Sequence, residues 1–245
     1  MLMKKAVIII IIILLIDQWS KVYIKTHFVL GDGFKVMGLD WFRIHFIENY
    51  GMAWGTEFGG SNGKLFLTFF RLIAIVGIGY WLYSAVKTNG HKILIIAIAL
   101  IFAGAMGNII DSVFYGVLFG DSHGSVATFL PEEGGYGTLF HGKVVDLFYF
   151  PIIENAQLPS WIPEISFNWP DWIPGIGGKN FSLFVDRNFT FFQYVFNVAD
   201  AAITAGVSLL LIFNKKVFPK KEKEEEPKDQ IVPPVVVRHY EKPKS

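Results

Sequence analysis

Four stretches of the chain are apolar over the length that a helix needs to cross a bilayer, which is about 20 residues. Polar and charged positions interrupt this pattern, and the two longest interruptions cover residues 27–63 and 116–191. A short turn at residues 87–92, KTNGHK, separates the second apolar stretch from the third. The pattern predicts four antiparallel membrane helices, over residues 5–26, 64–86, 92–115 and 192–213.

The first apolar stretch also has features of a secretory signal peptide, because MLMKK supplies a charged start and residues 6–16 an apolar centre. A signal peptide needs small residues at its cleavage site. The sequence that follows, DQWSKVYIK, contains no A-x-A pattern. We therefore expect the first helix to remain uncleaved.

Composition favours an integral membrane protein, since 52% of the residues are hydrophobic, 18% are charged, and mean hydropathy is +0.42. The formal net charge of +1 gives no reason to expect nucleic acid as a partner. The chain has no cysteine, which excludes disulfides, thiolate metal sites and cysteine nucleophiles. The six histidines form no H-x-x-x-H or H-E-x-x-H pattern, and no G-x-S-x-G or Walker sequence is present. We predict neither a metal nor a cofactor.

Lysine residues gather at one set of helix ends, which predicts the orientation in the membrane. They are Lys4, Lys5, Lys87, Lys92, Lys215, Lys216, Lys220 and Lys221. Because lysine and arginine near helix ends mark the cytoplasmic side, we expect both termini in the cytoplasm and the loops 27–63 and 116–191 outside. The chain then divides into a four-helix domain, residues 1–214, and a charged, Pro-rich tail, residues 215–245, that should be disordered.

Asp17 and Lys21 are the first polar residues that do not suit a lipid environment. They lie four residues apart near the outer end of the first helix, a spacing that places them on one face and permits an ion pair. The pair serves either as a lock between helices or as part of a site.

A second polar group lies at the outer end of the third helix. Gly104 and Gly107 are small enough to allow close helix packing. Asn108 and Asp111 lie beside them, and polar residues within a membrane helix are functional candidates. Packing explains the glycines but not these two side chains.

Asp146 and Asp200 are the remaining candidate carboxylates. Asp146 ends the run KVVD, and Asp200 lies about two turns into the fourth apolar stretch, so both are expected just below the outer membrane surface. Two carboxylates that share one proton are the catalytic arrangement of aspartic proteases. The alternative for each is a capping or ion-pair role, and Asn197 could satisfy such groups.

Five motifs in a fixed order now favour one interpretation. They are DQWSK (17–21), ENYGMAWG (48–55), GNIID (107–111), VVDLFYF (144–150) and FNVADAAITAG (196–206). On a four-helix hydropathy pattern, they resemble the sequence boxes of the lipoprotein signal peptidases, which are the type II signal peptidases of bacteria. The resemblance covers all four helices and most of the first outer loop.

This resemblance implies that Asp146 and Asp200 are the catalytic pair of a membrane-embedded aspartic endopeptidase in the bacterial cytoplasmic (inner) membrane. The implied partners are membrane lipid and a prolipoprotein, which is cut just before a cysteine that carries diacylglycerol, and we expect the enzyme to be a monomer. Gly51 and Ala53 would leave room for the substrate chain and its lipid. The implied supporting residues are Asp17, Lys21, Asn49, Gly51, Ala53, Asn108, Asp111, Asn197 and Ala199.

The fold class that the resemblance implies is an all-α membrane protein, with four antiparallel transmembrane helices and a small β-rich platform on the extracytoplasmic side. The sequence agrees in the first outer loop, where strand-like runs around residues 34–37 and 41–47 are broken at Gly and Asp.

The chain departs from the family pattern in two respects. Ser112 stands where the third box usually has an arginine, and Lys143 or Arg71 could supply that charge instead. Two insertions, about 117–142 and 151–190, separate boxes that are closer together in the family. Their many Gly, Pro, Trp and Phe residues favour the membrane–water interface, so we expect outer loops that rest near the site.

The competing hypothesis is a proton-coupled transporter or channel subunit, because membrane carboxylates often relay protons. The pattern shows no internal inverted repeat, and the polar residues gather at one surface rather than at the midplane. A noncatalytic assembly protein would not require two carboxylates at matched depth.

Overall fold

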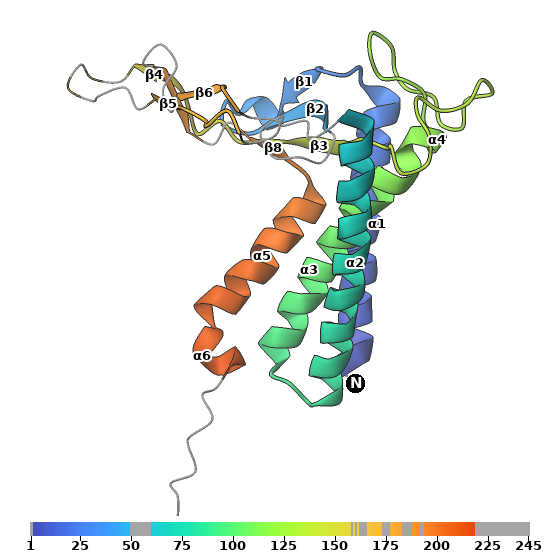
Figure 1. Cartoon of the computed structure of the whole chain (residues 1–245), viewed down its shortest axis with the longest axis vertical. Coiled ribbons are helices and arrows are strands. Elements are labelled where there is room, and N and C mark those ends of the chain that lie inside the picture. The colour runs from blue at the N-terminus through green and yellow to red at the C-terminus, as the bar shows by residue number, and fades with distance from the viewer. Residues whose placement is uncertain are drawn as a thin grey trace, which may run out of the picture.

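The structure is a computed structural model, and among the residues that it describes three helices are long and apolar enough to cross a membrane. It describes residues 2–49, 60–157, 159, 161, 166–172, 177–182, 188–191 and 194–218. The long helices are α1 (Leu2–His27), α2 (Gly60–Lys87) and α3 (Lys92–Ile110), of which α3 continues helically to Leu118. A shorter apolar helix, α5 (Val198–Ile212), packs beside α3. Figure 1 shows α1 and α3 running towards the strands, and α2 and α5 running away from them.

The outer surface of α2 is apolar, as expected for a helix that faces lipid. Phe66, Ile73, Val76 and Tyr80 each expose more than two thirds of their surface. A helix in water would turn such residues inward and present charges instead. These observations support the predicted membrane helices over 5–26, 64–86 and 92–115.

The fourth predicted helix begins later than the apolar pattern suggested. Residues 192–213 were expected to be helical, but Val195–Phe196 forms strand β8, and α5 begins only at Val198. Asn197 ends the strand and caps the helix. Asp200 therefore lies in the first turn of α5, not two turns inside it. At 1.5 Å per residue, α5 is about 22 Å long, which is less than the hydrocarbon thickness.

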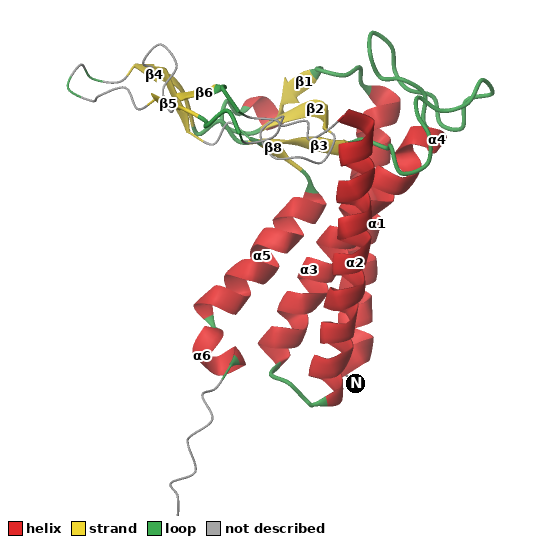
Figure 2. Cartoon of the chain, in the orientation of Figure 1, coloured by secondary structure: helices red, strands yellow, loops and turns green. Residues whose placement is uncertain are grey.

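A four-stranded antiparallel sheet lies across the end of the helices where α1 ends and α5 begins (Figure 2). Its strands, in spatial order, are β1 (Gly33–Lys35), β2 (Arg43–Asn49), β3 (Val144–Tyr149) and β8. The strand-like runs predicted in the first outer loop thus correspond to β1 and β2, joined through a single 3-10 turn, Val36–Gly38. The pairing of β2 with β3 places Glu48 opposite Val145.

The second insertion contains strands that the sequence did not predict. β4 (Ile153–Gln157) pairs with β7 (Asn188–Phe191), and β5 (Ser166–Asn168) pairs with β6 (Asn180–Ser182). The predicted all-α class therefore understates the strand content, because the insertion 151–190 was read as loops.

The first insertion is fastened to the end of α3. There the chain forms a π-helical segment, Asp111–Tyr115, followed by α4 (Gly116–Leu118). The returning amides of Phe140 and Gly142 donate to the carbonyl oxygens of Val113 and Ser112, both at 2.9 Å. A Cβ on Gly142 would lie 1.9 Å from the Asp111 carbonyl oxygen, so no larger residue fits there. The close approach fixes the backbone on which Asp111 is carried.

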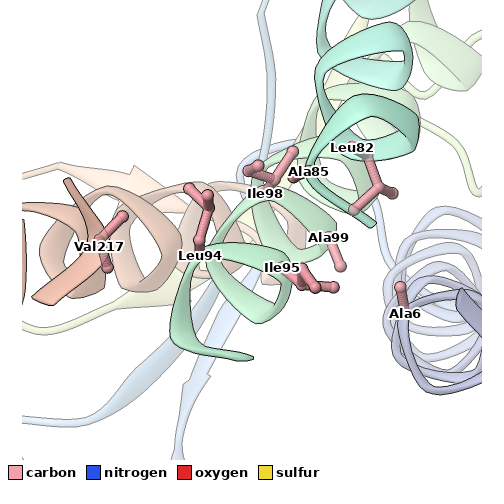
Figure 3. Packing of buried hydrophobic residues seen from close by; sticks show 8 residues of the cluster. All are labelled: Ala6, Leu82, Ala85, Leu94, Ile95, Ile98, Ala99 and Val217. Atoms are coloured by element: carbon pink, nitrogen blue, oxygen red, sulfur yellow. The ribbon is translucent and has the colours of Figure 1, made fainter. Parts of the chain in front are cut away.

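Apolar residues form a core at each end of the molecule. Far from the sheet, side chains of α1, α2 and α3 pack together with Val217 (Figure 3). Beneath the sheet, a second core joins α1 through Ile24 to β2 through Phe46 and to β3 through Val145 and Leu147. This second core holds the sheet against the helix ends and so fixes the height at which β3 presents Asp146.

The predicted tail, residues 215–245, starts with a short ordered turn. Asn214–Val217 forms helix α6, and Val217 is buried against α3 and its neighbours. Lys215, Lys216 and Val217 are thus helical rather than disordered. The rest of the predicted tail, from residue 219, lies outside the described residues.

Candidate active site

Asn197 connects the two candidate catalytic carboxylates, Asp146 and Asp200. Its side-chain Nδ2 donates to Asp146 Oδ1 at 2.7 Å, and its backbone amide donates to Asp200 Oδ2 at 3.3 Å. The Asp200 amide donates back to Asn197 Oδ1 at 2.9 Å, which completes a capping box at the start of α5. The fully buried Asn197 therefore contacts one carboxylate from β3 and one from α5.

Asp146 is the more buried member of the pair, with only 5% of its surface exposed. Its second oxygen, Oδ2, accepts from Nδ2 of Asn49, which lies on the neighbouring strand β2. Burial, together with the charge of Asp200, raises the pKa of Asp146 to about 8. Asp146 therefore holds a proton at neutral pH, and Asp200 beside it is partly exposed.

Asn108 holds Asp200 from the side of α3. Its Nδ2 donates to Asp200 Oδ1 at 2.8 Å, and its Oδ1 accepts from Lys21 Nζ at 3.0 Å and from Asn197 Nδ2 at 3.1 Å. Since Lys21 can only donate, it fixes the orientation of the Asn108 amide group. The amide that faces Asp200 is therefore held in place by a cation on α1.

Lys21 is itself fully buried between Asp17 and Asp111. Its Nζ lies 2.9 Å from Asp17 Oδ2 and 2.8 Å from Asp111 Oδ2. The other Asp17 oxygen accepts the backbone amide of Ala199 at 2.9 Å, and Asp111 Oδ2 accepts that of Val145 at 3.3 Å. The predicted Asp17–Lys21 ion pair is confirmed, and it joins the helices to the two residues that adjoin Asp200 and Asp146.

Small residues bring α3 and α5 into backbone contact, as predicted for Gly104 and Gly107. A Cβ on Gly104 would lie 2.2 Å from the Ala199 carbonyl oxygen, and one on Gly107 would lie 2.6 Å from Asp17 Oδ2. The fully buried Ala199 packs into this space. Larger side chains here would push Asp200 away from Asn108.

Two predicted supporting residues, Gly51 and Ala53, lie outside the described residues. Ser112, where the family pattern has arginine, donates its hydroxyl to the Asn108 carbonyl oxygen at 2.9 Å. Of the two cations proposed to replace that arginine, Lys143 lies 3.5 Å from Glu48. Arg71 lies where the charges of Asp200 and Asp111 act on it, so Arg71 is the better placed of the two.

Sequence reasoning missed Gln18, which links the buried charges. Its Nε2 donates to Asp111 Oδ1 at 2.9 Å, to Asp17 Oδ2 at 3.1 Å and to the Gly107 carbonyl oxygen at 3.2 Å, while its Oε1 accepts from Tyr115 at 3.2 Å. Gln18 belongs to the first motif, DQWSK, and that position beside Asp17 was the available signal.

Comparison with known proteins identifies the family. The sequence model of signal peptidase (SPase) II matches residues 9–215, which is most of the chain. The chain belongs to the signal peptidase II family. The prediction of an aspartic endopeptidase of this family is thereby confirmed, and a transporter or channel subunit is not favoured.

Individual relatives agree with this membership of the signal peptidase II family. The chain is 44% identical over 199 residues to a lipoprotein signal peptidase of Porphyromonas gingivalis, covering 81% of this chain and 77% of the relative. It is 31% identical over 201 residues to one of Amoebophilus asiaticus, with coverages of 81% and 72%. A bacterial membrane enzyme solved by the in meso method at 2.3 Å resolution shares the fold, with a TM-score of 0.51 and 24% identity over 91% of this chain and 95% of that one.

The raised pKa of Asp146 predicts the pH dependence of this signal peptidase II. We expect any cleavage that uses the Asp146 proton to slow as pH rises above about 8, because Asp146 then loses that proton. The rate should fall again at low pH, where both carboxyls hold protons, which gives a bell-shaped profile measurable with a peptide substrate. A rate that keeps rising well above pH 8 would contradict this assignment.

The pH dependence of protein stability gives an independent check on the proton held by Asp146. The folded protein keeps it up to about pH 8, whereas an unfolded aspartate loses it near pH 4. The contribution of Asp146 to stability is therefore fully present below about pH 4 and is lost as pH rises towards 8. Thermal unfolding in detergent should show that Asp146→Asn raises the unfolding temperature above that of the parent protein most strongly at pH values above about 8.

Proposed function

We propose that this protein cleaves the signal peptide from diacylglyceryl-modified prolipoproteins just before the lipidated cysteine, with Asp146 and Asp200 as the catalytic pair. The observation that carries the proposal is the bridge of Asn197, which hydrogen-bonds both carboxylates. Supporting it, burial makes Asp146 an acid at neutral pH beside a partly exposed Asp200. Two aspartates in unlike environments meet the need of peptide hydrolysis for one acid and one base.

In this mechanism, Asp200 takes a proton from a water molecule while the water oxygen attacks the scissile carbonyl carbon. Asp146 donates its proton to the carbonyl oxygen, so that the tetrahedral intermediate carries no net charge. When the C–N bond breaks, the proton on Asp200 passes to the leaving nitrogen of the cysteine. Asp146 recovers a proton from a hydroxyl of the intermediate as the new carboxyl group forms. The pair ends as it began.

The partners of Asp146 and Asp200 act as orienting groups in this proposal. Asn49 and Asn197 hold Asp146, while Asn108 holds Asp200. Lys21 lies behind Asn108, where it fixes an amide and touches neither carboxylate of the pair. We assign Asp17, Asp111 and Ala199 to the support of this frame, because their contacts join α1, α3, β3 and α5 beneath it.

The lipid on the substrate sets the choice of experiment. We propose that Gly51 and Ala53 leave space for the substrate chain and its lipid. The lipid would also lie against the apolar helices. The purified full-length protein in detergent should cleave a lipobox peptide with diacylglyceryl cysteine much faster than the same peptide without lipid. Asp200→Asn protein, purified in parallel, controls for contaminating peptidases. Equal cleavage of both peptides would exclude recognition of the lipid, and cleavage of neither would refute the proposed function.

We further propose the orientation in the bacterial inner membrane and a monomeric catalytic unit. The N-terminus and α6 both lie at the end of the helices opposite the sheet, which supports four spans with both termini in the cytoplasm and the sheet as an extracytoplasmic platform (Figure 1). A reporter fused after Ser245 should be active only in the cytoplasm, and light scattering in detergent should give the mass of one chain. Activity outside, or a larger mass, would count against these assignments.

A further inference from the structure

A second buried charge cluster lies beside the site, and the mechanism above does not use it. Lys25 of α1 and Glu48 of β2 form an ion pair, and their side chains are 0% and 1% exposed. Ser122, from the first insertion, accepts from Lys25 Nζ at 2.8 Å and donates to Glu48 Oε1 at 3.0 Å. The three side chains close a ring between a helix, a strand and the insertion.

The second Glu48 oxygen lies among further cationic groups of the cluster. Oε2 is buried and accepts no hydrogen bond from the described residues, and Lys143 Nζ lies 3.5 Å away. Lys25 and Lys143 both lie over the ring of Tyr136, with Nζ 4.8 and 5.3 Å from its centre. The charges of Lys64 and Asp121 also reach the cluster. Breaking such a buried pair is costly, so the ring holds Glu48 firmly.

Glu48 precedes Asn49, whose amide donates to Asp146. Successive side chains of a strand point to opposite faces, so anchoring Glu48 on one face sets the direction of Asn49 on the other. The β2–β3 ladder also holds this end of β2, since it pairs Glu48 with Val145 and Asn49 with Val144, but its register shifts between Ile44 and Ile47, just before Glu48. The Glu48 side chain therefore adds an anchor directly after this irregularity.

We propose that the ring of Lys25, Glu48 and Ser122 is a positioning device that holds Asn49 against Asp146, with the first insertion completing it. The inference rests on the proposed catalytic role of Asp146. It gives residues 117–142 a part in the reaction, since Ser122 closes the ring and Lys143 follows directly after this insertion. None of these side chains touches the carboxylate pair in the described contacts, so they act through Asn49.

The test compares two ion pairs that hold the ends of the same strand. In full-length protein, Glu48→Gln should lower kcat for the lipidated lipobox peptide by about 10- to 100-fold with little change in KM, because a displaced Asn49 misplaces Asp146. Glu154→Gln is the matched control: Glu154 binds Arg43, the first residue of β2, at 2.7 Å and is far more exposed. It should leave kcat unchanged.

Two readouts separate positioning from a general loss of structure. An amide that donates to a carboxylate favours its ionised form, so losing the Asn49 contact should move the alkaline limb of the pH profile to higher pH. In an Asn49→Ala background, Glu48→Gln should cost nothing further. Ser122→Ala keeps the ion pair and should move the alkaline limb of the pH profile to higher pH by a smaller amount. This variant preserves the test if Glu48→Gln protein does not fold.

The outcomes distinguish this inference from the function on which it rests. Folded Glu48→Gln protein with parental kcat and an unmoved alkaline limb would overturn the positioning role. So would a loss of kcat that remains undiminished in the Asn49→Ala background. If Asp146→Asn keeps its activity, the proposed catalytic pair is wrong, whatever Glu48→Gln does.

Discussion

Replacement of Asp146 or Asp200 by asparagine is expected to slow cleavage of the lipidated peptide by about 10⁴-fold or more. In the proposed mechanism, Asp146→Asn removes the proton that polarises the carbonyl, and Asp200→Asn removes the base that activates water. Both changes preserve volume, and the single side-chain oxygen of the asparagine introduced by Asp200→Asn can still accept from Asn108. The fold should therefore survive. The double variant should be scarcely slower than either single one, because the two groups act as a unit.

The matched control for this prediction is Asp40→Asn. Asp40 makes an ion pair with Lys35 on the exposed side of β1, and its side chain is 79% exposed. The same chemical change there should leave turnover within experimental error of the parent protein. A folded Asp146→Asn or Asp200→Asn variant that retains most of its activity would rule out the assigned pair.

The helices could be predicted from the sequence because membrane spans depend on local composition. Each apolar run of about 20 residues must satisfy its backbone hydrogen bonds internally, so it forms a helix whatever its neighbours are. The sheet could not be predicted to the same extent. β2 pairs with β3, which places Glu48 opposite Val145 across almost one hundred residues, and no pattern within either strand specifies that partner. The β1–β2 hairpin, whose strands are close in sequence, was found in outline.

The start of α5 was misplaced because hydropathy does not distinguish a buried strand from a helix over a few residues. Val195 and Phe196 are as apolar as the helix that follows, but they pair with Tyr149 and Phe148 of β3. The capping box of Asn197 and Asp200 was a readable signal for the true boundary. It also explains why Asp200 lies close to Asp146: Asp200 is in the first turn of α5, beside the Asn197 that contacts both carboxylates.

The supporting residues divide by the kind of signal that they leave in the sequence. Asp17, Lys21 and Lys25 recur every four residues on one face of an apolar helix, so the whole stripe was detectable, although only its first two members were recognised. Ser122 left no comparable signal, because a serine in a long loop is ordinary. Its importance becomes visible only when folding buries it against Lys25 and Glu48.

Removal of the Lys21 charge should have the largest effect on stability. In Lys21→Met, a side chain of similar length fills the space, but Asp17 and Asp111 are left buried without the cation between them. Removing one partner from a buried charge cluster typically costs about 3–5 kcal/mol. We expect a correspondingly lower midpoint of thermal unfolding in detergent. Turnover should also fall, because Asn108 loses the donor that fixes its orientation towards Asp200.

Asp17→Asn is the informative comparison, because it alters the same cluster and leaves Lys21 paired with Asp111. The asparagine oxygen can still accept the Ala199 amide, but its NH2 group no longer accepts from Lys21 and Gln18. The loss should therefore be about 2 kcal/mol, less than that of Lys21→Met, with most activity retained. Lys21→Met should be the less stable variant, because it leaves two buried carboxylates without a cation. Asp17→Asn leaves a cation that is still paired with one carboxylate. Equal damage from both substitutions, or parental stability of Lys21→Met, would show that Lys21 does not neutralise these two carboxylates in the folded protein.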